Sequence, residues 1–152
     1  MKKMKSKESP AIVFVDDDYE DVYPMIKAIR NYRKDVVCDR VSSGDELFDY
    51  LGGLGENKSE VMKESPRLIL MDINMPKQDG IEILKQLRID PVCGCVSVIM
   101  FTTSDSQEDI RKAYKAGANS YVCKPRNADE MRRIAENICD FWIDLAEVPT
   151  VA

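Results

Sequence analysis

Acidic side chains follow two apolar runs of the sequence at the point where each run ends. The segment AIVFV is followed by Asp16, Asp17 and Asp18. The segment RLILM is followed by Asp72. If the runs are strands of an open α/β sheet, these carboxylates share the crevice outside the strands' carboxyl ends, where ligands bind. Carboxylates in one crevice repel one another unless a cation lies among them, and an all-oxygen ligand set favours Mg²⁺.

The same pattern points to phosphoryl chemistry. A carboxylate beside a divalent cation can act as a nucleophile toward phosphorus, and Asp72 lies in MDINMPKQDG, where Pro76 and Gly80 are typical of a turn. Charge on the phosphoryl oxygens needs hydrogen-bond donors. Two further apolar runs end in suitable groups, the hydroxyl of Thr102 in IMFTTS and the ammonium of Lys124 in YVCKP. We expect all of these groups at one edge of the sheet.

Each of these residues also has an ordinary structural interpretation. An Asp after a strand is often a helix cap, Thr is common in strands, and Lys-Pro occurs in turns. Taken singly, each ordinary interpretation is the better one. Taken together, they require acids, a hydroxyl and an ammonium to coincide by chance at four strand ends, so the functional interpretation is favoured for the set.

The elements that must position these residues follow an alternating pattern. Short apolar runs alternate with amphipathic segments, which is typical of a parallel sheet with helices on both faces. We predict strands at 11–15, 36–41, 67–71, 96–101 and 119–123. We predict helices at 20–33, 44–51, 79–89, 107–116 and 127–146.

Three segments carry further expectations. Pro24 fits the first helix only if it falls in the first turn, where its missing N–H costs nothing. Residues 52–66 are expected to form a long surface loop. The last helix is expected to turn one apolar face toward the sheet, formed by Met131, Ile134, Ile138, Phe141, Trp142 and Leu145.

Size and composition limit the function classes. A chain of 152 residues with 44% hydrophobic and 32% charged residues suits one folded domain, expected at 11–146 between a flexible N-terminal tail, 1–10, and a C-terminal tail, 147–152. The net charge of −5 argues against binding to nucleic acid or anionic lipid. Apolar runs fall far short of the ~20 residues that span a bilayer, so a cytoplasmic protein is expected.

The histidine and cysteine content of the sequence narrows the possible chemistry further. The chain has no histidine, so it cannot build a Ser/His/Asp or Cys/His site, and it cannot be its own histidine phosphodonor. Its five cysteines are scattered, which favours free thiols over a disulfide framework.

The segments VDDD, MDINMPKQDG, FTTS and YVCKP, in this order and spacing, resemble the receiver domains of bacterial response regulators. The resemblance covers about residues 11–146. It implies a flavodoxin-like, doubly wound (βα)5 fold with a five-stranded parallel sheet in the order 2-1-3-4-5. It also implies a signalling module of two-component systems that accepts a phosphoryl group from a sensor histidine kinase on Asp72, with Mg²⁺ as cofactor.

The resemblance further implies roles for the matched residues around the metal. Asp17 matches a direct Mg²⁺ ligand, and Asp16 matches a ligand that acts chiefly through water. Asn74 matches the position whose backbone carbonyl completes the metal site. Asp72 is then both metal ligand and phosphoacceptor.

A second group of matched residues would respond to phosphorylation. Thr102 matches the hydroxyl residue that turns toward the phosphoryl group, and Lys124 matches the lysine that contacts it. Tyr121 matches the aromatic residue that swings inward on activation. Pro125 would follow a cis peptide bond.

A narrower resemblance concerns partners. The segment TTSDSQEDIRKAYKAGANSYVCKP and the ending DFWIDLAEVP resemble standalone receivers that pair with bacterial phytochromes, which implies a bacteriophytochrome kinase. Receivers of this family often pair through helix 107–116 and strand 119–123, so a homodimer is a further expectation. Asp18, Thr103 and Arg126 depart from the common family pattern.

The residues allow three alternative interpretations. A phosphohydrolase with an aspartyl nucleophile usually carries a second Asp two residues later, where this chain has Asn74, so an enzyme is not expected. A receiver-fold module that binds without phosphate would be favoured by a missing acid or lysine, and none is missing. A DNA-binding regulator is disfavoured because only one helix is expected after Lys124, with no basic recognition helix behind it.

Overall fold

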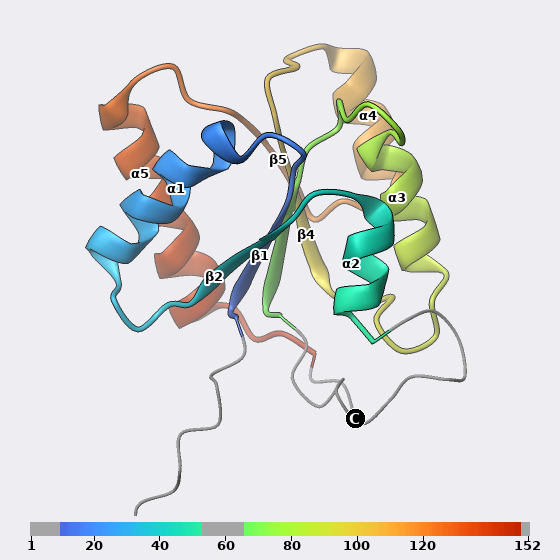
Figure 1. The fold of residues 1–152 in the computed structure, drawn as a ribbon, viewed down its shortest axis with the longest axis horizontal. Coiled ribbons are helices and arrows are strands. Elements are labelled where there is room, and N and C mark those ends of the chain that lie inside the picture. Colours follow the sequence, from blue (N-terminus) through green and yellow to red (C-terminus); the bar gives the residue numbers. More distant parts are fainter. Residues whose placement is uncertain (1–9, 53–65, 150–152) are drawn as a thin grey trace, which may run out of the picture.

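Five parallel strands form one sheet with helices on both faces (Figure 1). The computed structural model describes residues 10–52 and 66–149, so most of the predicted tails and of the loop 52–66 lies outside the described residues. The strand order is β2-β1-β3-β4-β5, which confirms the flavodoxin-like topology. The strands are β1 (Ile12–Val15), β2 (Cys38–Val41), β3 (Leu68–Met71), β4 (Ser97–Thr102) and β5 (Ser120–Cys123).

The helices divide between the two faces of the sheet. Alternate residues of β1 show the division, since Val13 and Val15 join one core cluster while Ile12 and Phe14 join the other. Figure 1 shows α1 and α5 on one face and α2, α3 and α4 on the other. The helices are α1 (Tyr19–Tyr32), α2 (Gly44–Tyr50), α3 (Gly80–Arg88), α4 (Gln107–Ala116) and α5 (Ala128–Ile138).

The register of the central strands brings the acidic segments together. Val15 at the end of β1 pairs with Met71 at the end of β3, so Asp16 and Asp72 follow as neighbours. The backbone N–H of Asp72 donates to the carbonyl of Val15 over 2.9 Å, which continues the ladder one residue past the strand. The two carboxylates therefore leave the sheet side by side.

The outer strands deliver the hydroxyl and the ammonium to the same edge. Thr102, the last residue of β4, pairs with Cys123 of β5. The backbone N–H of Lys124 donates to the carbonyl of Thr102 over 2.8 Å. The prediction that one edge of the sheet collects these residues is thus confirmed at the level of the backbone.

Pro24 does not lie in the first turn, so that expectation was wrong. Helix α1 begins at Tyr19, which makes Pro24 its sixth residue. The missing N–H deprives the carbonyl of Glu20 of its helical partner, but Glu20 lies in the exposed first turn, where water can replace it. Burial of Met25 and its apolar neighbours on the other side of α1 holds the helix together across the proline.

The last helix also differs from the prediction. It is α-helical only to Ile138 and continues as a π-helical segment, Cys139–Leu145. The wider turn, closed by an N–H of Ala146 that donates to the carbonyl of Phe141 over 2.6 Å, rotates the apolar face. Phe141 and Leu145 are consequently 48% and 70% exposed, and were wrongly expected to face the sheet.

No helix of the described residues is long and apolar enough to cross a membrane.

Candidate functional site

The carboxylate cluster that the sequence predicted is present at the carboxyl edge of the sheet. Asp16, Asp17 and Asp72 each offer a carboxylate oxygen, and these oxygens lie within 4.8 Å of one another. Asp16 and Asp72 are buried, while Asp17 is exposed. Hard oxygen donors around a site with one side open to water fit Mg²⁺ or Mn²⁺, which keep several water ligands.

The turn after β3 sets the position of Asp72. A Cβ atom at position 80 would overlap the carbonyl oxygen of Asp72, so only glycine allows the chain to pass this close. The N–H of Gly80 donates to the carbonyl of Ile73 over 2.9 Å. Asp79 then caps α3 by accepting a hydrogen bond of 2.7 Å from the N–H of Ile81.

Lys124 lies among the carboxylates. Its Nζ contacts Oδ2 of Asp16 at 2.8 Å, Oδ2 of Asp21 at 3.1 Å and Oδ2 of Asp72 at 3.3 Å. Burial by itself lowers the pKa of Lys124, but the hydrogen bond to Asp16 and the charges of Asp72 and Asp16 outweigh burial and raise the pKa above its usual value. The ammonium therefore stays charged and partly neutralises the cluster.

Lys124 supplies one positive charge, whereas Asp16, Asp17 and Asp72 can carry three negative charges, so this neutralisation is incomplete. Burial raises the pKa of Asp16, and hydrogen bonds from Lys124 and from the N–H of Asp18 offset only part of the rise. The charge of Asp72 raises it further. The cluster thus has room for additional positive charge, which a divalent cation would supply.

Thr102 is fully buried at the end of β4. Its Oγ1 is the one buried side-chain oxygen or nitrogen without a hydrogen-bond partner among residues 10–52 and 66–149. A buried hydroxyl without a protein partner is costly, so this group is available to a ligand, to a water molecule or to a group that approaches in another state of the protein.

Tyr121 lies on β5, and its contacts are with the loop after β4 and with the core, not with the carboxylate cluster. Its hydroxyl donates to the carbonyl of Ser104 over 2.8 Å, in the loop between β4 and α4, and its ring packs against the core cluster beneath α3 and α4. The hydroxyl of Ser104 in turn donates to Asp109 over 2.6 Å. The tyrosine is therefore tied to the loop that follows Thr102.

The remaining sequence-predicted positions have simpler surroundings. Asn74 is exposed in the turn two residues after Asp72. Asp18 caps α1, since its Oδ1 accepts a hydrogen bond of 3.0 Å from the N–H of Glu20. The expected cis bond before Pro125 was wrong, because the described residues contain no cis peptide bond; the trans form is intrinsically favoured even before proline.

Sequence reasoning missed Asp21. The residue lies in the first turn of α1, and its carboxylate reaches Lys124 across the crevice. Acids in the first turn of a helix are common because they interact favourably with the helix dipole, so the sequence held no distinctive signal.

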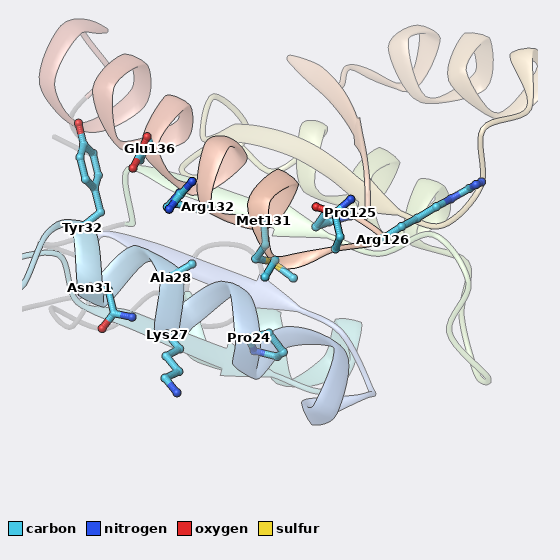
Figure 2. A pocket seen from close by; sticks show the side chains of 12 residues that line it. Pro24, Lys27, Ala28, Asn31, Tyr32, Pro125, Arg126, Met131, Arg132 and Glu136 are labelled. Atoms are coloured by element: carbon cyan, nitrogen blue, oxygen red, sulfur yellow. The ribbon is translucent and has the colours of Figure 1, made fainter.

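A groove runs beside the site between α1 and α5 (Figure 2). It has a volume of about 600 Å³, and Pro125 and Arg126 connect it to the segment that carries Lys124. Figure 2 shows Pro24 and Ala28 of α1 across the groove from Met131 of α5. The floor is thus partly apolar.

Fold and site together define a class: a doubly wound α/β domain with an acidic, lysine-containing site at the carboxyl edge of its sheet. The family model of the response regulator receiver domain matches residues 12–136. The chain therefore belongs to the receiver-domain family of two-component signalling, as the motifs predicted.

Similar proteins fall in the same family. Response regulator Rcp1 of Synechocystis sp. is 33% identical over 145 residues, which cover 95% of this chain and 97% of Rcp1. The phosphorylated cyanobacterial phytochrome response regulator RcpA has a TM-score of 0.78 at 30% identity, covering 93% of this chain and all (100%) of that one. The Mn²⁺-bound form of Rcp1 gives a TM-score of 0.78 at 26% identity, with coverage of 93% and 100%.

Proposed function

We propose that this receiver domain accepts a phosphoryl group on Asp72 from the phosphohistidine of a sensor histidine kinase and signals through protein contacts. The observation that carries the proposal is the juxtaposition at one sheet edge. Asp72 lies in a carboxylate cluster, 3.3 Å from the ammonium of Lys124, and Thr102 ends the neighbouring strand with a buried hydroxyl that lacks a partner.

The chain's own residues suit each step of the transfer. A carboxylate oxygen of Asp72 attacks phosphorus, and the new P–O bond forms as the P–N bond to the imidazole breaks. Lys124 can donate to a phosphoryl oxygen without gaining or losing a proton. The hydroxyl of Thr102 gives up no hydrogen bond to another described residue when it donates.

A divalent metal, Mg²⁺ in this proposal, would be held by Asp16, Asp17, Asp72 and the backbone carbonyl of Asn74. The three carboxylates fit a hard cation, and the Mn²⁺-bound form of Rcp1 shows that a relative takes a divalent metal. When bound, the metal supplies positive charge to the phosphoryl oxygens and to the cluster.

The signal is proposed to leave through the segment after β4. Thr102 precedes the loop whose Ser104 carbonyl accepts a hydrogen bond from the hydroxyl of Tyr121. A movement of Thr102 toward a phosphoryl group would therefore displace this loop and alter that hydrogen bond. Phosphorylation then shifts the population of conformations at α4 and β5, and a partner or a second copy reads this face. Because RcpA is a phytochrome response regulator, a bacteriophytochrome is the proposed type of kinase.

The test is direct phosphorylation. Purified protein is incubated with acetyl phosphate, with and without Mg²⁺, and its intact mass is measured. We expect a mass gain of one phosphoryl group that requires Mg²⁺, that Asp72→Asn abolishes, and that the exposed control Asp49→Asn retains. A folded protein that gains no mass under any condition would contradict the proposal and favour a binding module that works without phosphate.

A further inference from the structure

Lys124 has more partners than the proposed transfer requires. An ammonium has three N–H donors, and Nζ of Lys124 has an acceptor for each: Asp16 at 2.8 Å, Asp21 at 3.1 Å and Asp72 at 3.3 Å. Asp16 and Asp72 belong to the carboxylate cluster, but Asp21 does not. A phosphoryl oxygen can therefore bind Lys124 only if one of these contacts is given up.

Burial decides which contact is given up at least cost. The side chains of Asp16 and Asp72 are 4% and 10% exposed, whereas that of Asp21 is 49% exposed. A buried carboxylate that loses its cation is left without solvation, but a half-exposed one recovers its hydrogen bonds from water. Asp21 is thus the partner that Lys124 can leave most easily.

We propose that Asp21 is a positioning residue, which holds Lys124 on the α1 side of the site in the unphosphorylated protein and releases it to the phosphoryl group on Asp72. This inference rests on the proposed function. It assigns α1 a part in setting the rate, because the Asp21–Lys124 contact stabilises the unphosphorylated form and must be broken during transfer. Asp21 therefore slows phosphorylation.

The ordinary explanation of Asp21 is its place in the first turn of α1, where any acid interacts favourably with the helix dipole. Glu20 supplies a matched control, because it lies in the same turn and carries the same charge. Within the described residues Glu20 has no hydrogen bond or ion pair with Lys124. Neutralising Glu20 therefore changes the dipole interaction and the net charge while it leaves the Lys124 contacts intact.

The first experiment compares rates of phosphorylation by acetyl phosphate at saturating Mg²⁺. Asp21→Asn is expected to react about two- to fivefold faster than wild type, the size of effect typical of a partly exposed ion pair. Asp21→Glu, which keeps the charge, is expected to remain near the wild-type rate, and Glu20→Gln likewise. An unchanged or slower Asp21→Asn, or equal acceleration by Glu20→Gln, overturns the inference.

The second experiment uses unphosphorylated protein, so it does not depend on the proposed function. Hydrogen exchange of the Lys124 ammonium with water is followed by NMR on ¹⁵N-lysine-labelled protein, with the signal assigned from Lys124→Arg. We expect about two- to fivefold faster exchange in Asp21→Asn and none of this change in Glu20→Gln. Unchanged exchange in Asp21→Asn overturns the hold on Lys124, whereas failure of the wild type to be phosphorylated overturns the proposed function instead.

Discussion

Two charged clusters lie at opposite edges of the sheet, and each consists of one basic side chain in contact with aspartates. At the carboxyl edge, Lys124 contacts three aspartates, and its side chain is 9% exposed. At the amino edge, Arg33 contacts Asp35 at 2.8 Å and Asp144 at 2.6 Å, which ties the end of α1 to the π-helical segment. There the side chains of Asp35 and Asp144 are 67% and 50% exposed.

Because the two clusters differ in burial, they are expected to respond differently to an added charge. Water screens the charges around Arg33. That cluster can therefore link α1 to the π-helical segment, but an added charge nearby changes its interactions little. At the carboxyl edge the charges interact more strongly because Lys124, Asp16 and Asp72 are largely buried, and a phosphoryl group or a metal ion there must rearrange the contacts of Lys124. Substitutions at the two clusters should therefore differ in their effects.

Removing the buried cation is expected to have the largest effect on stability. Lys124→Met leaves Asp16 and Asp72 without their partner, and we expect the free energy of unfolding to fall by about 2–4 kcal/mol at pH 7 in the presence of a chelator. Urea denaturation measures the change. Lys112→Met, which removes a lysine paired with Glu108 at the surface, serves as control. Equal losses in the two variants would contradict the contrast between buried and exposed charge.

Adding a methyl group beneath Asp72 tests how tightly the backbone confines the buried cluster. In Gly80→Ala the new Cβ overlaps the carbonyl oxygen of Asp72, so the turn must shift. We expect a loss of about 1–3 kcal/mol in urea denaturation, with slower phosphorylation by acetyl phosphate in the fraction that remains folded. Wild-type stability in Gly80→Ala would show that the turn is more adaptable than the described contact allows.

Metal binding is expected to stabilise the buried cluster selectively. With free Mg²⁺ or Mn²⁺ at about ten times its dissociation constant, the free energy of unfolding rises by about 1.4 kcal/mol. Asp17→Asn removes a carboxylate of the cluster and is expected to abolish most of this gain, as measured by thermal unfolding with and without metal. Asp35→Asn, at the other edge, should keep the full gain, and a loss there would argue for unspecific binding to surface acids.

The sequence was sufficient to predict the buried cluster because its position follows from the strands. The β character of the apolar runs, the parallel sheet and the strand order place Asp16, Asp72 and Lys124 at one edge whatever the details of packing. Thr102 could be placed by the same reasoning. That its hydroxyl lacks a partner could not, because this depends on every neighbouring atom.

The structure differs from the sequence predictions where the packing of distant segments determines the local arrangement. The Asp21–Lys124 contact joins residues 103 positions apart and depends on how α1 lies over the sheet. The periodicity of the last helix could not reveal the π-helical turn, which changes the angle between successive side chains and turns Phe141 outward. Pro24 within α1 is tolerated because the buried face of that helix outweighs one lost hydrogen bond.

In the absence of metal, the buried carboxyl group of Asp16 is expected to make stability depend on pH. Burial raises the pKa of Asp16 in the folded state, so this carboxyl group favours folding when protonated at low pH and loses that contribution as the pH rises through its raised pKa. Asp16→Asn should therefore stabilise the metal-free protein at neutral pH, and the gain should shrink as the pH falls. Urea denaturation at a series of pH values with a chelator checks the sign, and a gain that grows toward acid pH would contradict it.

The smallest effect is expected at the amino edge. Asp144→Asn removes the ion pair with Arg33, but the guanidinium keeps Asp35, and water solvates whatever is exposed. We expect the midpoint of urea denaturation to move less than in any other variant of the series, and the small shift to disappear in high salt, which screens exposed pairs. The phosphorylation rate should not change. If Asp144→Asn altered that rate, the two edges would be coupled through α1, and the amino-edge cluster would have more than a structural role.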